Sequence, residues 1–244
     1  VTLLKQGKNL GLSANLIWFD ATANLERLSS REKVQKILDK CNDAGINGVA
    51  VGVKSSCGFV LYNSKIAPRM GNFMGRFDYP KDYDLLQTVI EEGRKRNIRV
   101  YAMLMVFAEG RLSNTTGPAY SNFKKQQSWL YDIGKDGEPA IFPAEESPTG
   151  VFVFVNPALA EVQQYELSII EEVARNYDVD GIIIDRCRYD GIRADFSEDS
   201  KRLFEKYIGD KICWPEDVYV LRPAASNYVP DPNLPAPEGW MIVP

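Results

Sequence analysis

Four ionisable side chains stand where apolar runs of the sequence end. Asp20 follows LIWF, Lys54 ends GVAVGVK, Glu109 follows YAMLMVFA, and Asp185 ends GIIID. Apolar runs of this length predict buried parallel strands, and the carboxyl ends of such strands meet at one edge of a sheet. We therefore expect the four side chains to converge on one site. The alternative is that each strand simply becomes polar where it leaves the core.

Two carboxyl groups suffice to hydrolyse a glycosidic bond, because one protonates the leaving oxygen while the other attacks the anomeric carbon or activates water. Asp185 is the candidate for the charged group, since Arg186 and Arg188 follow it and would hold it ionised. Glu109 is the candidate proton donor if apolar neighbours raise its pKa. Structural alternatives stay open: Asp185 could form an ion pair that closes the rim of the fold, and Arg111 could pair with Glu109.

Aromatic residues gather near the same strand ends. Trp18, Tyr62, Trp129 and Tyr189 all lie close to them in the sequence, and Asp190 follows Tyr189 directly. Sugars stack their C–H faces on aromatic rings, so this pattern predicts a carbohydrate groove. Packing in the core is the alternative for any single ring.

The composition excludes several kinds of site. The 244 residues include no histidine, so the chain cannot build a Ser-His-Asp triad or a histidine-ligated zinc site from its own side chains. A net charge of -4 without a basic stripe argues against a nucleic-acid partner. No glycine-rich phosphate loop follows a strand, and we expect neither a cofactor nor a metal. The alternative is a magnesium or calcium site with Asp20, Glu109 and Asp185 as oxygen ligands.

The cysteines and the hydropathy give weaker constraints. Four cysteines occur, none of them in a C-x-x-C pair, and a chain of this size does not need disulfides. Cys187, between two arginines, is more readily a small inward-facing residue than a reactive thiol. No apolar run approaches the roughly 18 to 20 residues of a membrane span.

A helix followed by a short apolar strand recurs along the chain. The helical segments show apolar residues at helical spacing together with capping residues, namely Ser29 with Glu32 as a capping box, Asn156 as N-cap with Pro157 at the first helical position, and Gly209 as a stop. The expected helices span 29–45, 82–97, 156–177 and 197–208, and the expected strands span 10–20, 46–54, 98–107 and 179–185.

This order predicts four parallel βα units, which is half of a (β/α)8 barrel or a small open α/β sheet. Two long insertions, 55–81 and 109–150, follow strands, and loops at the carboxyl ends of strands build the sites of such folds. We expect one glycosidase-like domain over 1–220 and an extended proline-rich tail over 221–244.

Several stretches resemble the glycosyl-hydrolase-like family 10 proteins of bacteria. The resemblance covers residues 10 to 217 and is most specific in RCRYDG and in YNSKIAP, which contains Tyr62 and Asn63. The family has a TIM-barrel fold related to the alpha-amylase group, and one branch acts on denuded peptidoglycan glycan strands. The resemblance implies an exported glycosidase with Asp185 at the strand position of the nucleophile.

The sequence departs from this family where a fifth strand should supply the proton donor. The second half of the barrel is not recognisable, so we expect the chain either to self-associate or to be completed by a further half barrel. A glycoside hydrolase acting on a polysaccharide in the periplasm or at the cell surface, with a leader removed before Val1, is the first hypothesis. A carbohydrate-binding protein without turnover is the second. The candidate catalytic residues are Asp185 and Glu109, and the candidate substrate-binding residues are Asp20, Trp18, Lys54, Tyr62, Asn63, Arg186, Arg188, Tyr189 and Asp190.

Overall fold

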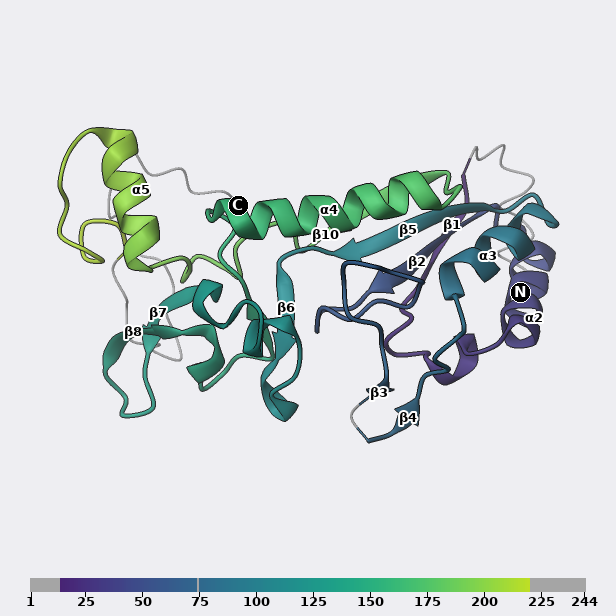
Figure 1. The fold of residues 1–244 in the computed structure, drawn as a ribbon, viewed down its shortest axis with the longest axis horizontal. Coiled ribbons are helices and arrows are strands. Elements are labelled where there is room, and N and C mark those ends of the chain that lie inside the picture. The colour runs from purple at the N-terminus through teal and green to yellow at the C-terminus, as the bar shows by residue number, and fades with distance from the viewer. Residues whose placement is uncertain (1–13, 74, 220–244) are drawn as a thin grey trace, which may run out of the picture.

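A computed structural model describes residues 14–73 and 75–219, and its centre is a sheet of four parallel strands (Figure 1). The strands lie in the order β1-β2-β5-β10, as β1 (Leu16–Phe19), β2 (Gly48–Lys54), β5 (Arg99–Met105) and β10 (Gly181–Asp185). The expected parallel sheet is thereby confirmed. Within the described residues the sheet is open and does not close into a barrel.

Three helices connect these strands and cover one face of the sheet. They are α2 (Arg31–Asp43), α3 (Leu85–Arg94) and α4 (Ala160–Asn176). Side chains of β2 and β5 alternate, so Val49, Val51 and Val53 pack with Val100 and Leu104 under the helices and are almost fully buried. Burial of each such side chain stabilises the fold by about 1.5 to 3 kcal/mol.

The insertion after β5 forms a second small core. In it β6 (Ala108–Arg111) pairs with β9 (Phe152–Phe154), and β7 (Trp129–Ile133) pairs with β8 (Pro139–Pro143), both antiparallel. The insertion after β2 contains the hairpin β3 (Asn72–Phe73) and β4 (Phe77–Asp78). Short 3-10 helices complete the connections, as η1 (Glu26–Leu28), η2 (Leu112–Asn114), η3 (Pro118–Tyr120), η4 (Lys124–Gln126) and η5 (Ala144–Glu146).

The last helix, α5 (Glu198–Ile208), lies beside the β7–β8 hairpin rather than on the sheet (Figure 1). Its predicted limits are confirmed: the Ser197 hydroxyl accepts a hydrogen bond from Ser200 N at 3.2 Å, and Gly209 ends the helix with a positive φ of 78°. The first four residues of the expected strand 10–20 and the expected tail over 221–244 lie outside the described residues.

Two predicted helix starts were wrong. The cap of α2 is Ser30, which accepts from Lys33 N, because the Ser29 hydroxyl donates instead to Glu26 O at 2.7 Å. The helix expected to start at Asn156 begins at Ala160. The Asn156 amide donates to the hydroxyls of Ser197 and Ser200. The Asn156 side chain therefore connects the segment before α4 to the start of α5 instead of capping α4.

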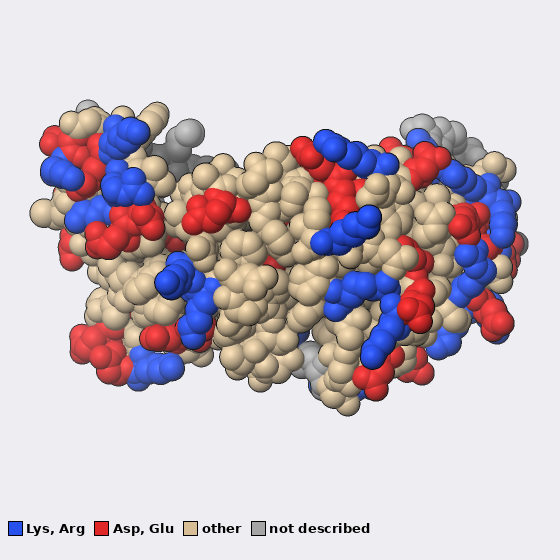
Figure 2. Space-filling model, viewed as in Figure 1, with Lys and Arg blue, Asp and Glu red and all other residues tan. Residues whose placement is uncertain are grey.

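The face of the molecule in Figure 2 carries charges of both signs. Lysines and arginines are mixed with acidic residues over α5 and over α2 and α3, with a mostly uncharged band between. Such mixing does not form the basic stripe that a nucleic acid would need. Among the described residues, no helix has the length and apolarity required to cross a bilayer.

Both edges of the sheet expose apolar side chains. Leu16 on β1 is 53% exposed and Ile184 on β10 is 50% exposed, and each of these strands pairs with only one neighbour in the described structure. Unpaired apolar edge strands are templates for pairing with another chain.

We predict that the chain self-associates with rising concentration and that the Leu16→Lys/Ile184→Lys variant does so much less, because a charge on an edge strand opposes pairing. Sedimentation velocity over a concentration series measures this. Ile192→Lys, at an exposed loop position, is the control and should behave as the wild type. A wild-type chain that stays monomeric throughout the series would contradict the prediction.

Candidate active site at the carboxyl edge of the sheet

Lys54, the last residue of β2, is the centre of a buried ionic cluster. Its side chain is 0% exposed; it forms an ion pair with Glu109, and its Nζ lies 3.1 Å from Glu166 Oε2. Nζ also donates to Met105 O at 2.6 Å and to Val106 O at 2.7 Å. The cluster therefore joins β2, the end of β5, β6 and α4 at one edge of the sheet.

Local structure explains how these three ionic side chains meet. The β2–β5 register shifts between Gly52 and Lys54, and Glu109 enters on β6 directly after the β5 strand. Glu166 lies on the buried face of α4 with Val162 and Ile169, at positions of helical spacing. Sequence reasoning missed Glu166, although a carboxylate within an otherwise apolar helical stripe is a signal that could have found it.

The cluster holds one cation and two carboxyl groups, so their protonation is linked. Burial lowers the pKa of Lys54, but the charges of Glu109 and Glu166 outweigh burial and raise it, so the ammonium is retained. Burial raises the pKa of Glu109 and raises that of Glu166 to about 9. At neutral pH the cluster therefore holds one charged pair and one protonated carboxyl, which we assign to Glu166.

Asp185 is linked to this cluster through the backbone. Val106, whose carbonyl accepts from Lys54, donates its N–H to Asp185 O at 2.8 Å, and Phe107 N donates to Arg186 O at 3.2 Å. The register also places Asp185 beside Met105. Val106 therefore contacts both the Lys54 ammonium and the end of β10.

Arg186 gives the chain a sharp turn directly after Asp185. Its φ is 51°, in the left-handed region that costs a non-glycine residue about 1 to 2 kcal/mol, and such a conformation persists only where the surroundings enforce it. The Asp185 carboxylate accepts a hydrogen bond from Arg186 N at 2.7 Å, and the Arg186 guanidinium lies 4.7 Å from the centre of the Phe152 ring. This enforced turn directs the Asp185 side chain at the edge of the sheet.

The two arginines do not pair with Asp185 in the way the sequence suggested. Arg188 lies over the Phe154 ring and donates to the carbonyls of Tyr189 and Asp190, and in residues 14–73 and 75–219 neither guanidinium forms an ion pair with Asp185. The arginines instead fasten the loop after β10 onto β9.

Other candidate residues lie along the same edge. Asp20 follows β1 and its carboxylate accepts from Ala23 N at 3.1 Å, which closes a turn. Trp18 is 51% exposed on the face of β1 opposite the helices. Tyr189 is exposed and Asp190 is half-buried, and burial raises the pKa of Asp190 against the opposing charges of nearby arginines.

Tyr62 and Asn63 lie on the helix-covered side instead. Tyr62 is fully buried with its ring 5.4 Å from that of Tyr177, edge to face. Asn63 N donates to Asp84 Oδ2 at 2.9 Å, and the Asn63 side chain accepts from Arg69. These contacts hold the insertion after β2 against α3 and the end of α4.

The YNSKIAP segment is anchored to α4 by a second buried glutamate. The Ser64 hydroxyl donates to Glu172 at 2.5 Å and Lys65 N donates to the other carboxylate oxygen at 2.7 Å. YNSKIAP, one of the two segments in which the family resemblance is most specific, therefore supports the fold beside the site.

The structure places the three candidate ligands of the metal alternative apart and leaves the described thiols unpaired. Among the described residues, no group of three or more acidic or cysteine side chains could hold a metal ion, so Asp20, Glu109 and Asp185 do not form the alternative cation site. Cys187, expected to face inward, is exposed, because the chain leaves the sheet at Arg186. The described cysteines are free thiols.

We predict that Glu166→Gln reduces the pH dependence of stability. Folded Glu166 keeps its proton up to about pH 9, whereas an unfolded carboxyl loses it near 4.5. The contribution of Glu166 to the free energy of unfolding is therefore fully present below the unfolded pKa. It is lost as the pH rises through the folded pKa, at about 1.4 kcal/mol per pKa unit. Urea denaturation between pH 5 and 9 should show a steeper fall for the wild type.

The control for this experiment is Glu171→Gln, the neighbouring exposed residue of α4, which pairs with Arg175. It should leave the wild-type pH profile almost unchanged. Parallel profiles for the wild type and Glu166→Gln would show that Glu166 does not carry the buried proton.

Comparison with known proteins shows a family match and relatives at 30% identity. A family model described as glycosyl hydrolase-like 10 matches residues 14–225. An S-layer-related protein of Niallia circulans is 30% identical over 84% of this chain and 13% of its own length. Glycosyl hydrolase DigH of Escherichia coli K12 is 30% identical over 68% of this chain and 37% of its own length. The chain thus spans well under half of these relatives.

The fold also has a counterpart among solved structures. Alpha-L-fucosidase isoenzyme 2 from Paenibacillus thiaminolyticus matches with a TM-score of 0.50 and 18% identity, over 75% of this chain and 23% of that one. This likeness concerns the fold, and it agrees with a sheet of the glycosidase TIM-barrel type.

Proposed function

Because the chain belongs to the glycosyl hydrolase-like 10 family, we propose that it carries the catalytic edge of a glycoside hydrolase that cleaves a polysaccharide. The observation that carries the proposal is Asp185 at the carboxyl end of β10, tied to the Lys54 cluster and followed by the enforced turn at Arg186. Rigid placement of a carboxylate at a strand end is what such chemistry requires.

In this proposal Asp185 acts as the charged carboxylate. It attacks the anomeric carbon or stabilises the positive charge that develops there as the glycosidic bond breaks. The enforced turn and the hydrogen bond from Arg186 N fix its orientation, so little reorganisation is needed in the transition state.

Glu109 takes a positioning role in this proposal. Its side chain is 0% exposed and paired with Lys54, so a sugar does not reach it in this structure. The proton donor must be partly exposed and must hold its proton near neutral pH. Asp190 is the candidate for this role, because it is half-buried, lies five residues after Asp185, and has its pKa raised by burial. A carboxyl from further chain is the alternative.

Peptidoglycan glycan strands are the first substrate to test, supported by the resemblance to a family with a branch that acts on them. An exported location, periplasmic or at the cell surface, is supported by the S-layer-related relative. A carbohydrate-binding role without turnover is the second candidate. The burial of Glu109 favours it, because the carboxyl expected to donate the proton is enclosed.

We predict that Asp185→Asn lowers glycan hydrolysis by about a thousandfold or more, because the amide cannot supply the negative charge. The assay is release of reducing ends from a panel of polysaccharides that includes amidase-stripped peptidoglycan. Asp178→Asn is the matched control, since Asp178 is an exposed residue just before the same strand that pairs with Arg94.

Hydrolysis that persists in Asp185→Asn would refute the catalytic assignment. If neither the wild type nor the variant releases product, while both bind one glycan of the panel, the binding role replaces the enzymatic one.

A further inference from the structure

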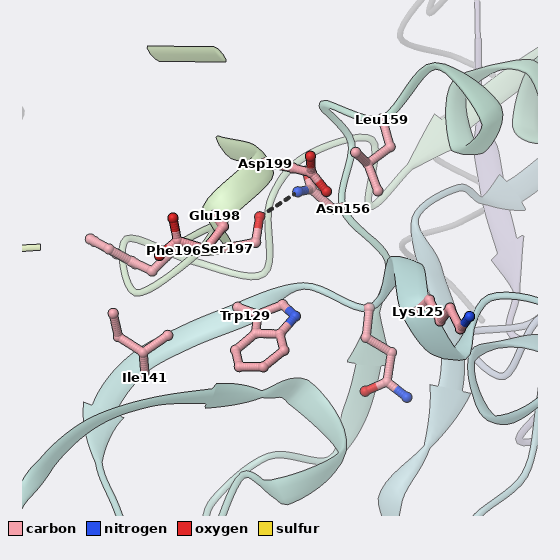
Figure 3. A pocket seen from close by; sticks show the side chains of 10 residues that line it. Lys125, Trp129, Ile141, Asn156, Leu159, Phe196, Ser197, Glu198 and Asp199 are labelled. Atoms are coloured by element: carbon pink, nitrogen blue, oxygen red, sulfur yellow. Dashed lines mark hydrogen bonds between the residues drawn. The ribbon is translucent and has the colours of Figure 1, made fainter. Parts of the chain in front are cut away.

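A pocket opens between the β7–β8 hairpin and the first turn of α5 (Figure 3). Its volume of about 450 Å³ is within the range of small-molecule sites. Trp129, Leu159 and Phe196 supply apolar walls, and Lys125, Glu198 and Asp199 supply charged groups. The site described above does not use these residues.

Part of the pocket wall is preformed by two buried amide side chains. Asn156, 1% exposed, donates to the hydroxyls of Ser197 at 3.2 Å and Ser200 at 3.0 Å. Gln127, 2% exposed, donates to Ala119 O at 2.8 Å. Because these bonds exist without a ligand, binding here needs little ordering of the protein.

The pocket is joined to Asp185 by one short segment. Residues 186–197 run from the end of β10 to α5 along β7, where Tyr131 N donates to Arg193 O and Phe196 N donates to Trp129 O, both at 2.9 Å. Trp129 N in turn donates to the Asp195 carboxylate at 2.9 Å. The segment that follows the proposed nucleophile therefore forms one rim of the pocket.

The chemistry of the lining suits a sugar ring. Trp129 is 38% exposed and lines the pocket (Figure 3), and its indole N–H donates no hydrogen bond within the described part of the chain. Glu198 and Asp199 on α5 offer acceptors for hydroxyl groups, and Lys125 offers a donor. An aromatic face beside hydroxyl-binding groups of both polarities recognises a neutral pyranose better than an ion of either sign.

We propose that this pocket is a carbohydrate-binding subsite that holds a neutral pyranose unit of the polysaccharide whose glycosidic bond lies at Asp185. The inference rests on the proposed function and extends it. Trp129 stacks on the C–H face of the sugar, Glu198 and Asp199 accept from its hydroxyls, and the buried amides keep the wall in place.

The test measures glycan binding in the Asp185→Asn background, which removes turnover. Soluble glycan strands from amidase-digested peptidoglycan and, separately, maltoheptaose are titrated by calorimetry. Adding Trp129→Ala should weaken binding of the recognised glycan at least tenfold, Trp129→Phe should restore most of it, and Glu198→Gln should weaken it several-fold. Tyr207→Ala, an exposed aromatic of the same helix outside the pocket, should have no effect.

The outcomes separate this inference from the proposed function. Unchanged affinity in folded Trp129→Ala and Glu198→Gln overturns the subsite, even if hydrolysis depends on Asp185. Absence of binding to both probes by the Asp185→Asn protein also overturns it. Hydrolysis that ignores Asp185, together with binding that depends on Trp129, keeps the subsite and removes the proposed catalytic assignment.

Discussion

The ammonium of Lys54 lies in the interior of the protein, and the carboxyl edge of the sheet supplies the partners that this buried charge requires. Removing a cation from water costs several kcal/mol unless partners surround it. Two carbonyls at the end of β5, the Glu109 carboxylate and Glu166 provide these partners from three directions. Any movement of β6 or α4 away from the sheet would leave a buried charge without its partners.

This requirement reaches the proposed chemistry through the backbone. The Val106 carbonyl accepts from Lys54 and the Val106 N–H donates to Asp185 O, so the backbone of one residue connects the buried cation with the candidate nucleophile. The enforced conformation of Arg186 then sends the chain past the phenylalanines of β9 and along β7 to the pocket at Trp129. The Lys54 cluster, Asp185 and the pocket at Trp129 are thus connected by one continuous stretch of contacts.

The periodic part of the fold was accessible from the sequence, because apolar spacing specifies which face of a strand or helix is buried. The four parallel strands and α5 with its end at Gly209 followed from that pattern, whereas the Ser197 cap was seen only in the structure. The pairing of Lys54 with Glu109 did not, because it depends on a register shift and on where β6 begins. Spacing predicted the convergence of these strand ends, but it could not show which side chain turns inward.

The same limit explains the residues whose placement differed from expectation. Asn156 has the sequence signature of a helix cap, yet its amide finds partners on α5, 41 and 44 residues away. Tyr62 was an aromatic near a strand end, but the chain folds back and buries it against Tyr177. Contacts between distant segments decide such cases, and local patterns do not contain them.

Amide hydrogen exchange tests most directly whether the Lys54 cluster holds the candidate active site in place. In Lys54→Met/Glu109→Gln, which removes one cation and one anion together, exchange at Val106 and Phe107 should accelerate at least tenfold. Val100, whose N–H binds the Asp180 carboxylate at the opposite edge, should keep its wild-type rate. Equal rates at Val106 and Phe107 in variant and wild type would contradict the central role of the cluster.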